Sequence, residues 1–279
     1  CTLPDIYDWE WFPDESGIIF RIPPSAQNIP EYPSGLYTMS PSGDDIQRIV
    51  PWERISEYDL SKDGERIAFA AINNQTGLSQ LWVVDRDGRN LNLIDSYDLL
   101  QNPYSGIGAI KWSPSGKYII YMAGNPTGLW IIKPDGTGKT KIDPDGGYID
   151  FSYVRWSPDS KNIAYLIDTW DANNGYYYPK VRVSDTFGNR REIFDMTSYG
   201  TYFEWLNNEK IVVSMPSDIY NWTETLWLID ASGAGNHIKL SNDIREISIS
   251  KDRQSIAFSA FVNDTAYLNI SDINGNINT

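Results

Sequence analysis

The chain of 279 residues contains one cysteine, Cys1, and one histidine, His237. No disulfide can form within the chain, and the Cys/His clusters that hold transition metals are absent. A single histidine in a surface setting is a weak general base, and no convincing set of nucleophile, base and orienting group can be assembled. The sequence therefore predicts no catalytic residue, no enzymatic activity and no cofactor.

Basic residues are also scarce. The chain has 23 Lys and Arg against 37 Asp and Glu, a formal net charge of -14 and a sequence pI near 4.4. This balance argues against nucleic acid as a partner, because phosphate binding needs clustered Lys and Arg. It favours a basic protein or peptide, a divalent cation or a neutral polysaccharide.

Long apolar runs are missing too, and no segment approaches the eighteen or so residues of a transmembrane helix. A chain that begins at cysteine is typical of a bacterial lipoprotein after removal of its signal peptide. Cys1 is therefore a candidate lipid anchor, with a chance cysteine as the less favoured alternative. With that anchor, we expect an extracytoplasmic location, either periplasmic or at the cell surface.

No segment has a helical period, but one pattern returns along the whole chain. It reads as a strand, a tight Pro/Asp/Gly turn and a second strand, which is typical of a β-hairpin. Its turn position falls at six residues, namely Asp14, Asp63, Ser115, Asp159, Asn208 and Asp252. A period in the forties is typical of a propeller or a solenoid.

Each hairpin is followed by a third strand and, after an Asp/Gly turn, by a mixed fourth strand. The third strands, such as Leu-Trp-Val-Val at 81–84, are apolar on both faces, which is expected when each sheet packs between two others. Such units close into a ring. We predict an all-β, six-bladed β-propeller of four-stranded antiparallel blades. It forms a single domain over residues 1–279, with blades near 5–50, 57–94, 108–143, 150–195, 201–240 and 245–279.

The motifs Trp-Ser-Pro-Ser-Gly-Lys at 112–117 and Trp-Ser-Pro-Asp-Ser-Lys at 156–161 resemble the repeats of TolB-type β-propellers. The propellers of prolyl oligopeptidase-like proteins have similar repeats. The resemblance implies a six-bladed propeller of the bacterial envelope that docks proteins or peptides. The chain has no Gly-x-Ser-x-Gly motif, so the peptidase branch of the resemblance lacks its nucleophile elbow.

Propeller topology places the turns after first and third strands on one side and the longer loops on the other. Binding sites favour long loops on a rigid scaffold. The long-loop face is predicted to be acidic and rich in aromatic residues, which suit a protein or glycan interface. The candidate binding residues are Trp52, Tyr104, Trp170, Tyr176, Tyr177, Tyr178, Tyr220 and Trp222. The favoured hypothesis is a non-catalytic scaffold that docks a protein, a peptide or a polysaccharide there.

Three alternatives remain open at this point. A glycan-active enzyme could use a carboxylate pair on the same face. The chain could also be a structural subunit of a cell-surface assembly, in which a neighbour completes the short last blade. A structural calcium ion is conceivable at 143–147 or 85–90, where oxygen ligands gather. Asn-x-Ser/Thr motifs begin at Asn74, Asn221, Asn263 and Asn269 and matter only in an organism that glycosylates them.

Overall fold

The computed structural model describes residues 6–24, 32–52, 54–100, 106–124, 127–143, 148–172, 175–218, 223–262 and 265–278. These residues form β-strands joined by turns and contain no helix. Within this part of the chain, accordingly, no helix has the length and apolarity needed to cross a membrane. The chain folds into two compact units, Cys1–Gly146 and Gly147–Thr279, which are described separately below.

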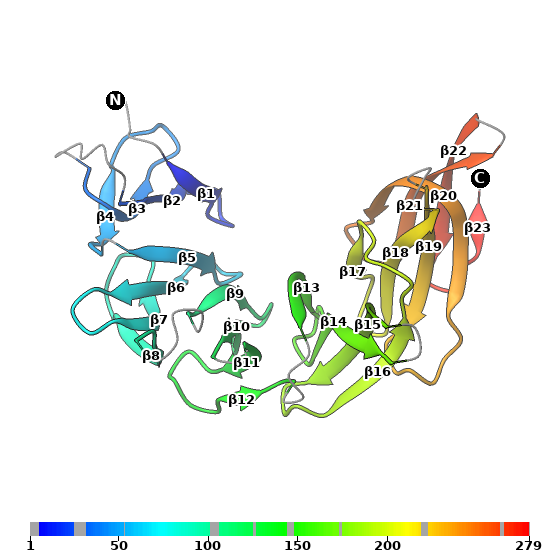
Figure 1. Cartoon of the computed structure of the whole chain (residues 1–279). Coiled ribbons are helices and arrows are strands. Elements are labelled where there is room, and N and C mark those ends of the chain that lie inside the picture. Colours follow the sequence, from blue (N-terminus) through cyan, green and yellow to red (C-terminus); the bar gives the residue numbers. More distant parts are fainter. Residues whose placement is uncertain are drawn as a thin grey trace. The chain divides into compact units, whose positions relative to one another are not determined.

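The first unit contains three antiparallel sheets of four strands each, drawn from blue to green in Figure 1. In every sheet the strands lie side by side in chain order. The first sheet consists of β1 (Tyr7–Trp11), β2 (Ile18–Ile22), β3 (Gly35–Met39) and β4 (Gln47–Val50). The second consists of β5 (Ile55–Leu60), β6 (Arg66–Asn73), β7 (Leu78–Asp85) and β8 (Asn92–Asp98). The third consists of β9 (Gly108–Trp112), β10 (Ile119–Ala123), β11 (Gly128–Ile132) and β12 (Thr140–Lys141).

The second unit contains one four-stranded sheet and one seven-stranded sheet, again antiparallel and in chain order. The four-stranded sheet consists of β13 (Ile149–Trp156), β14 (Asn162–Asp171), β15 (Tyr176–Asp185) and β16 (Arg190–Asp195). The seven-stranded sheet consists of β17 (Phe203–Trp205), β18 (Lys210–Asp218), β19 (Thr223–Asp230), β20 (Ile238–Ile249), β21 (Ser255–Val262), β22 (Thr265–Asp272) and β23 (Ile277–Asn278).

The length of β20 explains the seven-stranded sheet. Its first residues pair with β19, as in Trp227↔Lys239, and its last residues pair with β21, as in Ile249↔Ile256. One strand of 12 residues thus serves as the outer strand of the fifth repeat and the inner strand of the sixth. The prediction of all-β, antiparallel, four-stranded sheets is confirmed for four repeats, whereas the last two repeats form one continuous sheet rather than two separate blades.

The repeated turn has the same backbone in successive sheets. In the second sheet the N–H of Gly64 donates to the carbonyl of Ser61 at 2.8 Å, and in the third Gly116 donates to Ser113 at 2.9 Å. The turn needs a positive φ at this position, +74° at Gly64 and +66° at Gly116, and Ser160 adopts +65° at the equivalent place. Glycine relieves the steric cost there, so the Asp/Gly pattern in the sequence encodes the hairpin directly.

The apolar cores lie between neighbouring sheets within each unit. In the first unit, Leu81 and Val83 of the second sheet pack with Ile110 and Tyr121 of the third. In the second unit, Leu166 of the four-stranded sheet packs with Val213 of the next sheet. The second sheet is covered on both faces, by the first and the third sheets, so its central strands have no polar side, as the sequence predicted.

A tryptophan at the end of the first strand ties the third sheet, and likewise the seven-stranded sheet, to the sheet before it. The indole Nε1 of Trp112 donates to the carbonyl of Asp59 at 3.1 Å, 53 residues earlier in the chain. In the second unit, Trp205 donates in the same way to the carbonyl of Arg155 at 3.0 Å. The indole buries a large apolar surface while its N–H is satisfied, so this residue links neighbouring repeats rather than simply ending a strand.

Candidate functional site

The β14–β15 hairpin carries the most exposed aromatic cluster among the predicted binding residues. Its two strands pair over ten residues, up to Trp170↔Tyr177 and Asp171↔Tyr176. The rings of Trp170 and Tyr177 meet edge to face with their centroids 5.0 Å apart. The two side chains remain 53% and 64% exposed. A mutually braced ring pair that stays open to solvent is suited to contact a partner.

Strand alternation decides which residues share the face of this ring pair. Side chains two residues apart on a strand, and cross-strand neighbours, lie on the same face. Asp168 therefore lies on the face of Trp170 and Tyr177. Tyr176 and Tyr178 lie on the opposite face, where the Lys180 Nζ is 5.5 Å from the centroid of the Tyr178 ring.

Asp168 also belongs to a group that we call the tyrosine–carboxylate cluster, in which Asp168 is hydrogen-bonded to Tyr199 and the Tyr199 ring packs on that of Tyr153. The Tyr199 hydroxyl donates to Asp168 Oδ1 at 2.6 Å. The rings of Tyr153 and Tyr199 are 5.4 Å apart, and the Tyr153 hydroxyl donates to the carbonyl of Gly200 at 2.7 Å. Burial, followed by the hydrogen bond to Asp168, raises the pKa of Tyr199, so that it stays a hydrogen-bond donor at neutral pH.

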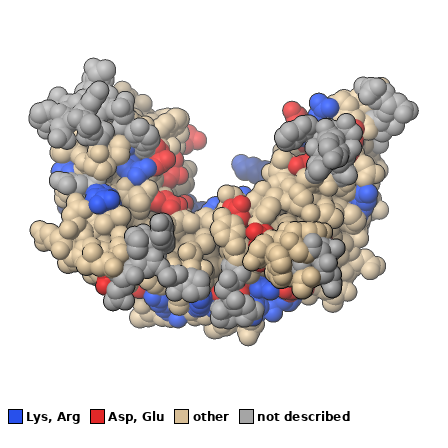
Figure 2. Space-filling view, viewed as in Figure 1, with Lys and Arg blue, Asp and Glu red and all other residues tan. Residues whose placement is uncertain are grey.

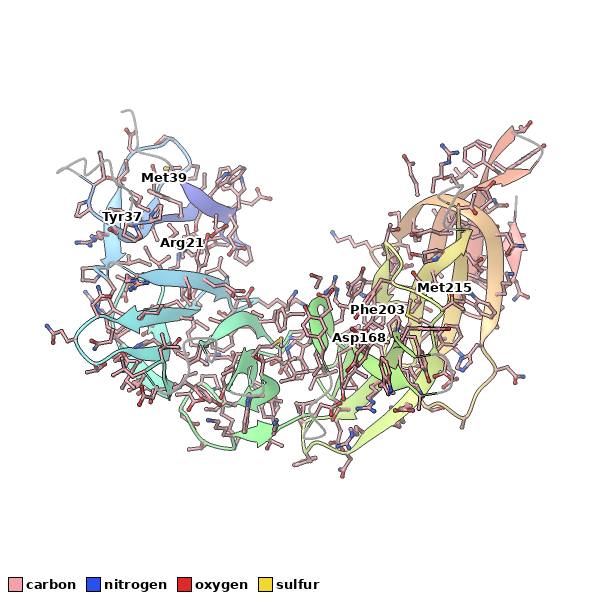
Figure 3. All side chains as sticks on the ribbon, in the orientation of Figure 1. Arg21, Tyr37, Met39, Asp168, Phe203 and Met215 are labelled. Carbon is pink, nitrogen blue, oxygen red and sulfur yellow. The ribbon has the colours of Figure 1, made fainter. Side chains whose placement is uncertain are left out.

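Figure 3 places Asp168 together with Phe203 and Met215 in the second unit, on β14, β17 and β18 respectively. Phe203 is buried and meets the Tyr153 ring edge to face at 6.1 Å. The Met215 sulfur accepts a contact from the Thr197 hydroxyl at 3.8 Å. The cluster thus rests on packed side chains, which restricts its movement.

A further carboxylate, Glu224, lies close to the cluster on β19. Its two oxygens accept the backbone N–H and the hydroxyl of Thr201 at 3.0 and 2.7 Å. Its charge and that of Asp150 both raise the pKa of Tyr153, after burial. The ring pair and the three carboxylates, Asp150, Asp168 and Glu224, provide aromatic contact area beside negative charge.

The other candidate binding residues have different surroundings. Trp52 is half-buried between Phe69 and Trp82, with ring centroids 5.6 and 4.6 Å away, so its ring is used in core packing. Tyr178 is half-buried. Tyr104, Tyr220, Trp222 and the candidate anchor Cys1 lie outside the described residues.

The other sequence motifs act in local structure. In the proposed cation loop at 85–90, Asn90 Nδ2 donates to Asp85 Oδ2 at 2.6 Å, and Asn189 and Asn276 bond Asp185 and Asp272 in the same way. This repetition indicates turn chemistry. Within the described ranges, no three His, Cys, Asp or Glu side chains are grouped as metal ligands. Asp143 is buried, and residues 144–147 lie outside those ranges.

Of the glycosylation motifs, Asn74 is exposed and accepts a hydrogen bond from Arg54 at 3.2 Å, whereas Asn269 is only 9% exposed on β22. Asn221 and Asn263 lie outside the described residues. His237 packs edge to face on Phe194 at 5.1 Å. Asn74, Asn269 and His237 hydrogen-bond or pack with residues outside the ring pair and the tyrosine–carboxylate cluster.

The sequence did not single out a group of half-buried carboxylates in the first unit. Figure 2 shows Asp and Glu side chains gathered over β1 and β5. Glu57 accepts the backbone N–H groups of Ala109 and Ile110, and Asp59 Oδ2 accepts the N–H of Trp112 at 2.6 Å. Burial raises the pKa of Glu57, and it raises the pKa of Asp59 to about 7. The only signal in the sequence was that Asp59 and Trp112 are separated by about one repeat.

No family model matches the chain. A stretch of 125 residues, 42% of this chain, is 30% identical to dipeptidyl-peptidase 5 of Porphyromonas gingivalis. The match spans only 18% of the length of that curated relative.

Solved structures of low identity share the fold. The β-propeller domain of the Trilobed protease from Pyrococcus furiosus is 14% identical, with a TM-score of 0.59 over 98% of this chain and 82% of that chain. Oligogalacturonate lyase from Vibrio parahaemolyticus is also 14% identical, with a TM-score of 0.58 over 95% and 76%. TolB from Acinetobacter baumannii is 17% identical over 88% and 58%, but its TM-score of 0.46 supports no argument. These neighbours establish a β-propeller fold, and membership of the TolB-type family stays a prediction.

The comparisons overturn the prediction of a protein without enzymatic activity. The relative in sequence is a peptidase, and the structural neighbours include part of a protease and a lyase. The prediction relied on a single histidine and a missing Gly-x-Ser-x-Gly motif. Those absences argue only against particular mechanisms, because propellers bring residues from several blades together at sites that no local motif reveals.

Proposed function

We propose that this β-propeller acts in peptide hydrolysis and binds peptide substrates at the ring pair of the β14–β15 hairpin. The observation that carries the proposal is the 30% identity over 125 residues to a dipeptidyl-peptidase. Structural similarity at 14% identity supports the fold alone, so the choice of peptide as the substrate class rests on that relative.

The hairpin provides a suitable surface for an extended peptide. Trp170 and Tyr177 offer apolar ring area, and aromatic anchors of this kind contribute much of the binding energy in many interfaces. Asp168, Asp150 and Glu224 place negative charge beside them. The chain as a whole carries a net charge of -14. We therefore expect peptides with a basic residue next to an apolar one to bind more tightly than acidic peptides of the same length.

Binding and hydrolysis can be measured separately. Fluorescein-labelled hexapeptides in basic, neutral and acidic series are titrated against the purified chain, and dipeptidyl-methylcoumaryl amides report hydrolysis. Each substitution, Trp170→Ala and Tyr177→Ala, should weaken peptide binding by about five- to fifty-fold, which corresponds to about 1–2 kcal/mol for a partly exposed aromatic anchor.

The chain offers a matched control. Phe187 is 79% exposed in the turn at the other end of the same sheet, so Phe187→Ala removes an exposed ring without touching the hairpin end. It should leave the affinity unchanged. Equal loss in all three variants, or full affinity in both hairpin variants, would show that the ring pair is not the site. A chain that binds oligogalacturonate at this site but no peptide would favour the glycan alternative.

We also infer six four-stranded repeats, with β20 shared between the fifth and the sixth. The support is the division of β20 between two partner strands. An extracytoplasmic location is part of the proposal and rests on the resemblance of the repeats to TolB-type propellers. Fractionation of the native cells tests it, and recovery of the protein in the cytosolic fraction would contradict it.

A further inference from the structure

A groove of about 550 Å³ lies in the first unit between the second and third sheets. Its walls are formed by β7 and the start of β8 on one side, and by the β9–β10 and β11–β12 turns on the other. The lining combines apolar surface from Val83, Tyr118 and Pro134 with three cationic side chains, Arg66, Lys117 and Lys133. We call it the cationic groove. Its size falls in the range of small-molecule sites.

The lining of this groove carries a net positive charge, whereas the chain as a whole is negative. Three cations face one carboxylate, Asp135, although the protein carries 37 acidic and 23 basic residues. Asp135 accepts hydrogen bonds from the hydroxyl and the N–H of Thr137 at 2.7 and 2.8 Å, and these bonds, together with the charge of Lys133, lower its pKa and keep it ionised. It offsets one of the three positive charges, so the lining as a whole stays positive.

A neighbouring groove shows that the positive charge is confined to the cationic groove. It has a volume of about 600 Å³, lies between the first and second sheets, and shares Arg66 with the cationic groove. Its lining includes four carboxylates, Asp45, Glu65, Asp85 and Asp87. Two adjacent grooves in the same repeat architecture thus have opposite charge, and an anion would distinguish between them.

Comparison of equivalent turns shows how the cationic groove arises. In the fourth repeat Lys161 pairs with Asp159 of its own turn at 3.4 Å. In the third repeat Ser115 stands where the fourth has Asp159, and Lys117 follows two residues later. The replacement removes the carboxylate that would otherwise sit beside Lys117 and leaves its charge for the groove.

Arg66 is held in place by two contacts. Its NH2 donates to the carbonyl of Gly116 at 2.8 Å, and its guanidinium carbon lies 4.7 Å from the centroid of the Trp112 ring. Asn92 Nδ2 donates across the groove to the carbonyl of Pro134 at 3.4 Å. One wall cation is therefore preorganised, and two flexible lysines can adjust around a ligand.

We propose that the cationic groove binds a short oligomer that carries two or more carboxylates. The lysines supply separated point charges, and the apolar floor accepts the body of the ligand. The carboxylates could come from an acidic peptide or from a uronate oligosaccharide, and the chemistry of recognition is the same for both. This site is distinct from the ring pair of the second unit, so the inference does not depend on the proposed function.

Calorimetric titration of the full chain with triglutamate and trigalacturonate tests the proposal, with trialanine and maltotriose as uncharged counterparts. At least one of the two anions should bind, more weakly as salt is raised. The double variant Lys117→Ala/Lys133→Ala should lower its affinity by about tenfold, since an exposed charge contributes roughly a two- to five-fold effect. Lys161→Ala, at the equivalent position of the fourth repeat, should leave the affinity unchanged.

Circular dichroism of each variant confirms that it is folded. Binding of triglutamate alone would assign the groove to an acidic peptide, and binding of trigalacturonate alone would assign it to a uronate. The proposal is overturned if neither anion binds, if the uncharged counterparts bind equally well, or if Lys161→Ala weakens binding as much as the double variant.

Discussion

The half-buried carboxylate of Asp59 should make the stability of the first unit fall as the pH rises, the opposite of the usual behaviour of a carboxylate. Asp59 lies on β5, and its Oδ2 accepts the N–H of Trp112 on β9 at 2.6 Å. Burial raises its pKa to about 7 and the charges of Glu10 and Glu57 add to the rise, while the hydrogen bond from Trp112 and the charge of Lys111 oppose it. The perturbation that tests this is Asp59→Asn, which keeps the shape and the acceptor oxygen but removes the titration.

Proton linkage gives the direction in which the free energy of unfolding changes with pH. Between pH 4 and pH 7 the folded state holds a proton on Asp59 that the unfolded state has already lost, so the free energy of unfolding falls as the pH rises. A pKa about 3 units above the ordinary value of 3.8 sets an upper bound of about 4 kcal/mol. Because the side chain is only half-buried, solvent screening reduces this, and we expect about 2 kcal/mol.

Urea denaturation followed by tryptophan fluorescence at pH 5, 6, 7, 8 and 9 measures the effect. The wild type should lose about 1–1.5 kcal/mol more than Asp59→Asn between pH 5 and pH 8, which is most of the whole effect, and the variant should be the more stable protein at pH 9. Asp63 in the following turn is the control. Hydrogen bonds from the Ser61 hydroxyl and the Glu65 N–H lower its pKa, so Asp63→Asn should leave the slope above pH 5 unchanged. Parallel curves for wild type and Asp59→Asn would refute the reasoning.

Two further predictions concern packing, and both are checked by urea denaturation. Trp205 is fully buried and its indole N–H bonds the carbonyl of Arg155, so Trp205→Ala should lower the free energy of unfolding by about 3–5 kcal/mol, and Trp205→Phe by clearly less. A Cβ at Gly200 would lie 1.8 Å from the carbonyl oxygen of Ser214, so Gly200→Ala should cost more than about 2 kcal/mol. Gly175→Ala meets only open space, and its positive φ should cost about 1 kcal/mol; equal effects of the two glycine substitutions would contradict this account.

The fold could be predicted because its information is local and repeated. The turn around Gly116 needs a positive φ, and five-residue strands such as β10 and β11 are apolar on both faces. Both properties are visible in single segments of sequence. The merging of the last two repeats could not be predicted, because nothing in residues 238–249 says that one strand continues where others break.

The candidate site was predictable only in part. Exposure of Trp170 and Tyr177 follows from their place near the end of a long hairpin, which the aromatic run suggested. Trp52 had the same sequence signal, yet its ring packs between Phe69 and Trp82. Whether a loop aromatic faces solvent or its own core depends on contacts with residues far away in the chain, and composition cannot show this.

The charges of the two grooves also differ between copies of the repeat in a way that composition does not show. The structural positions of the repeat, such as the turn glycine and the inter-sheet tryptophan, are filled similarly in several copies, because each copy must solve the same folding problem. The turn position beside the cationic groove differs in charge between copies: Asp159 accepts hydrogen bonds from the Ser157 hydroxyl and the Lys161 N–H and pairs with Lys161, whereas Ser115, two residues before Lys117, is neutral. Ser115 gives up the carboxylate that the equivalent turns use for local hydrogen bonds, and a ligand for the groove explains that departure. In repeat proteins of this kind, the differences between copies are therefore the better guide to function, and their similarities are the better guide to fold.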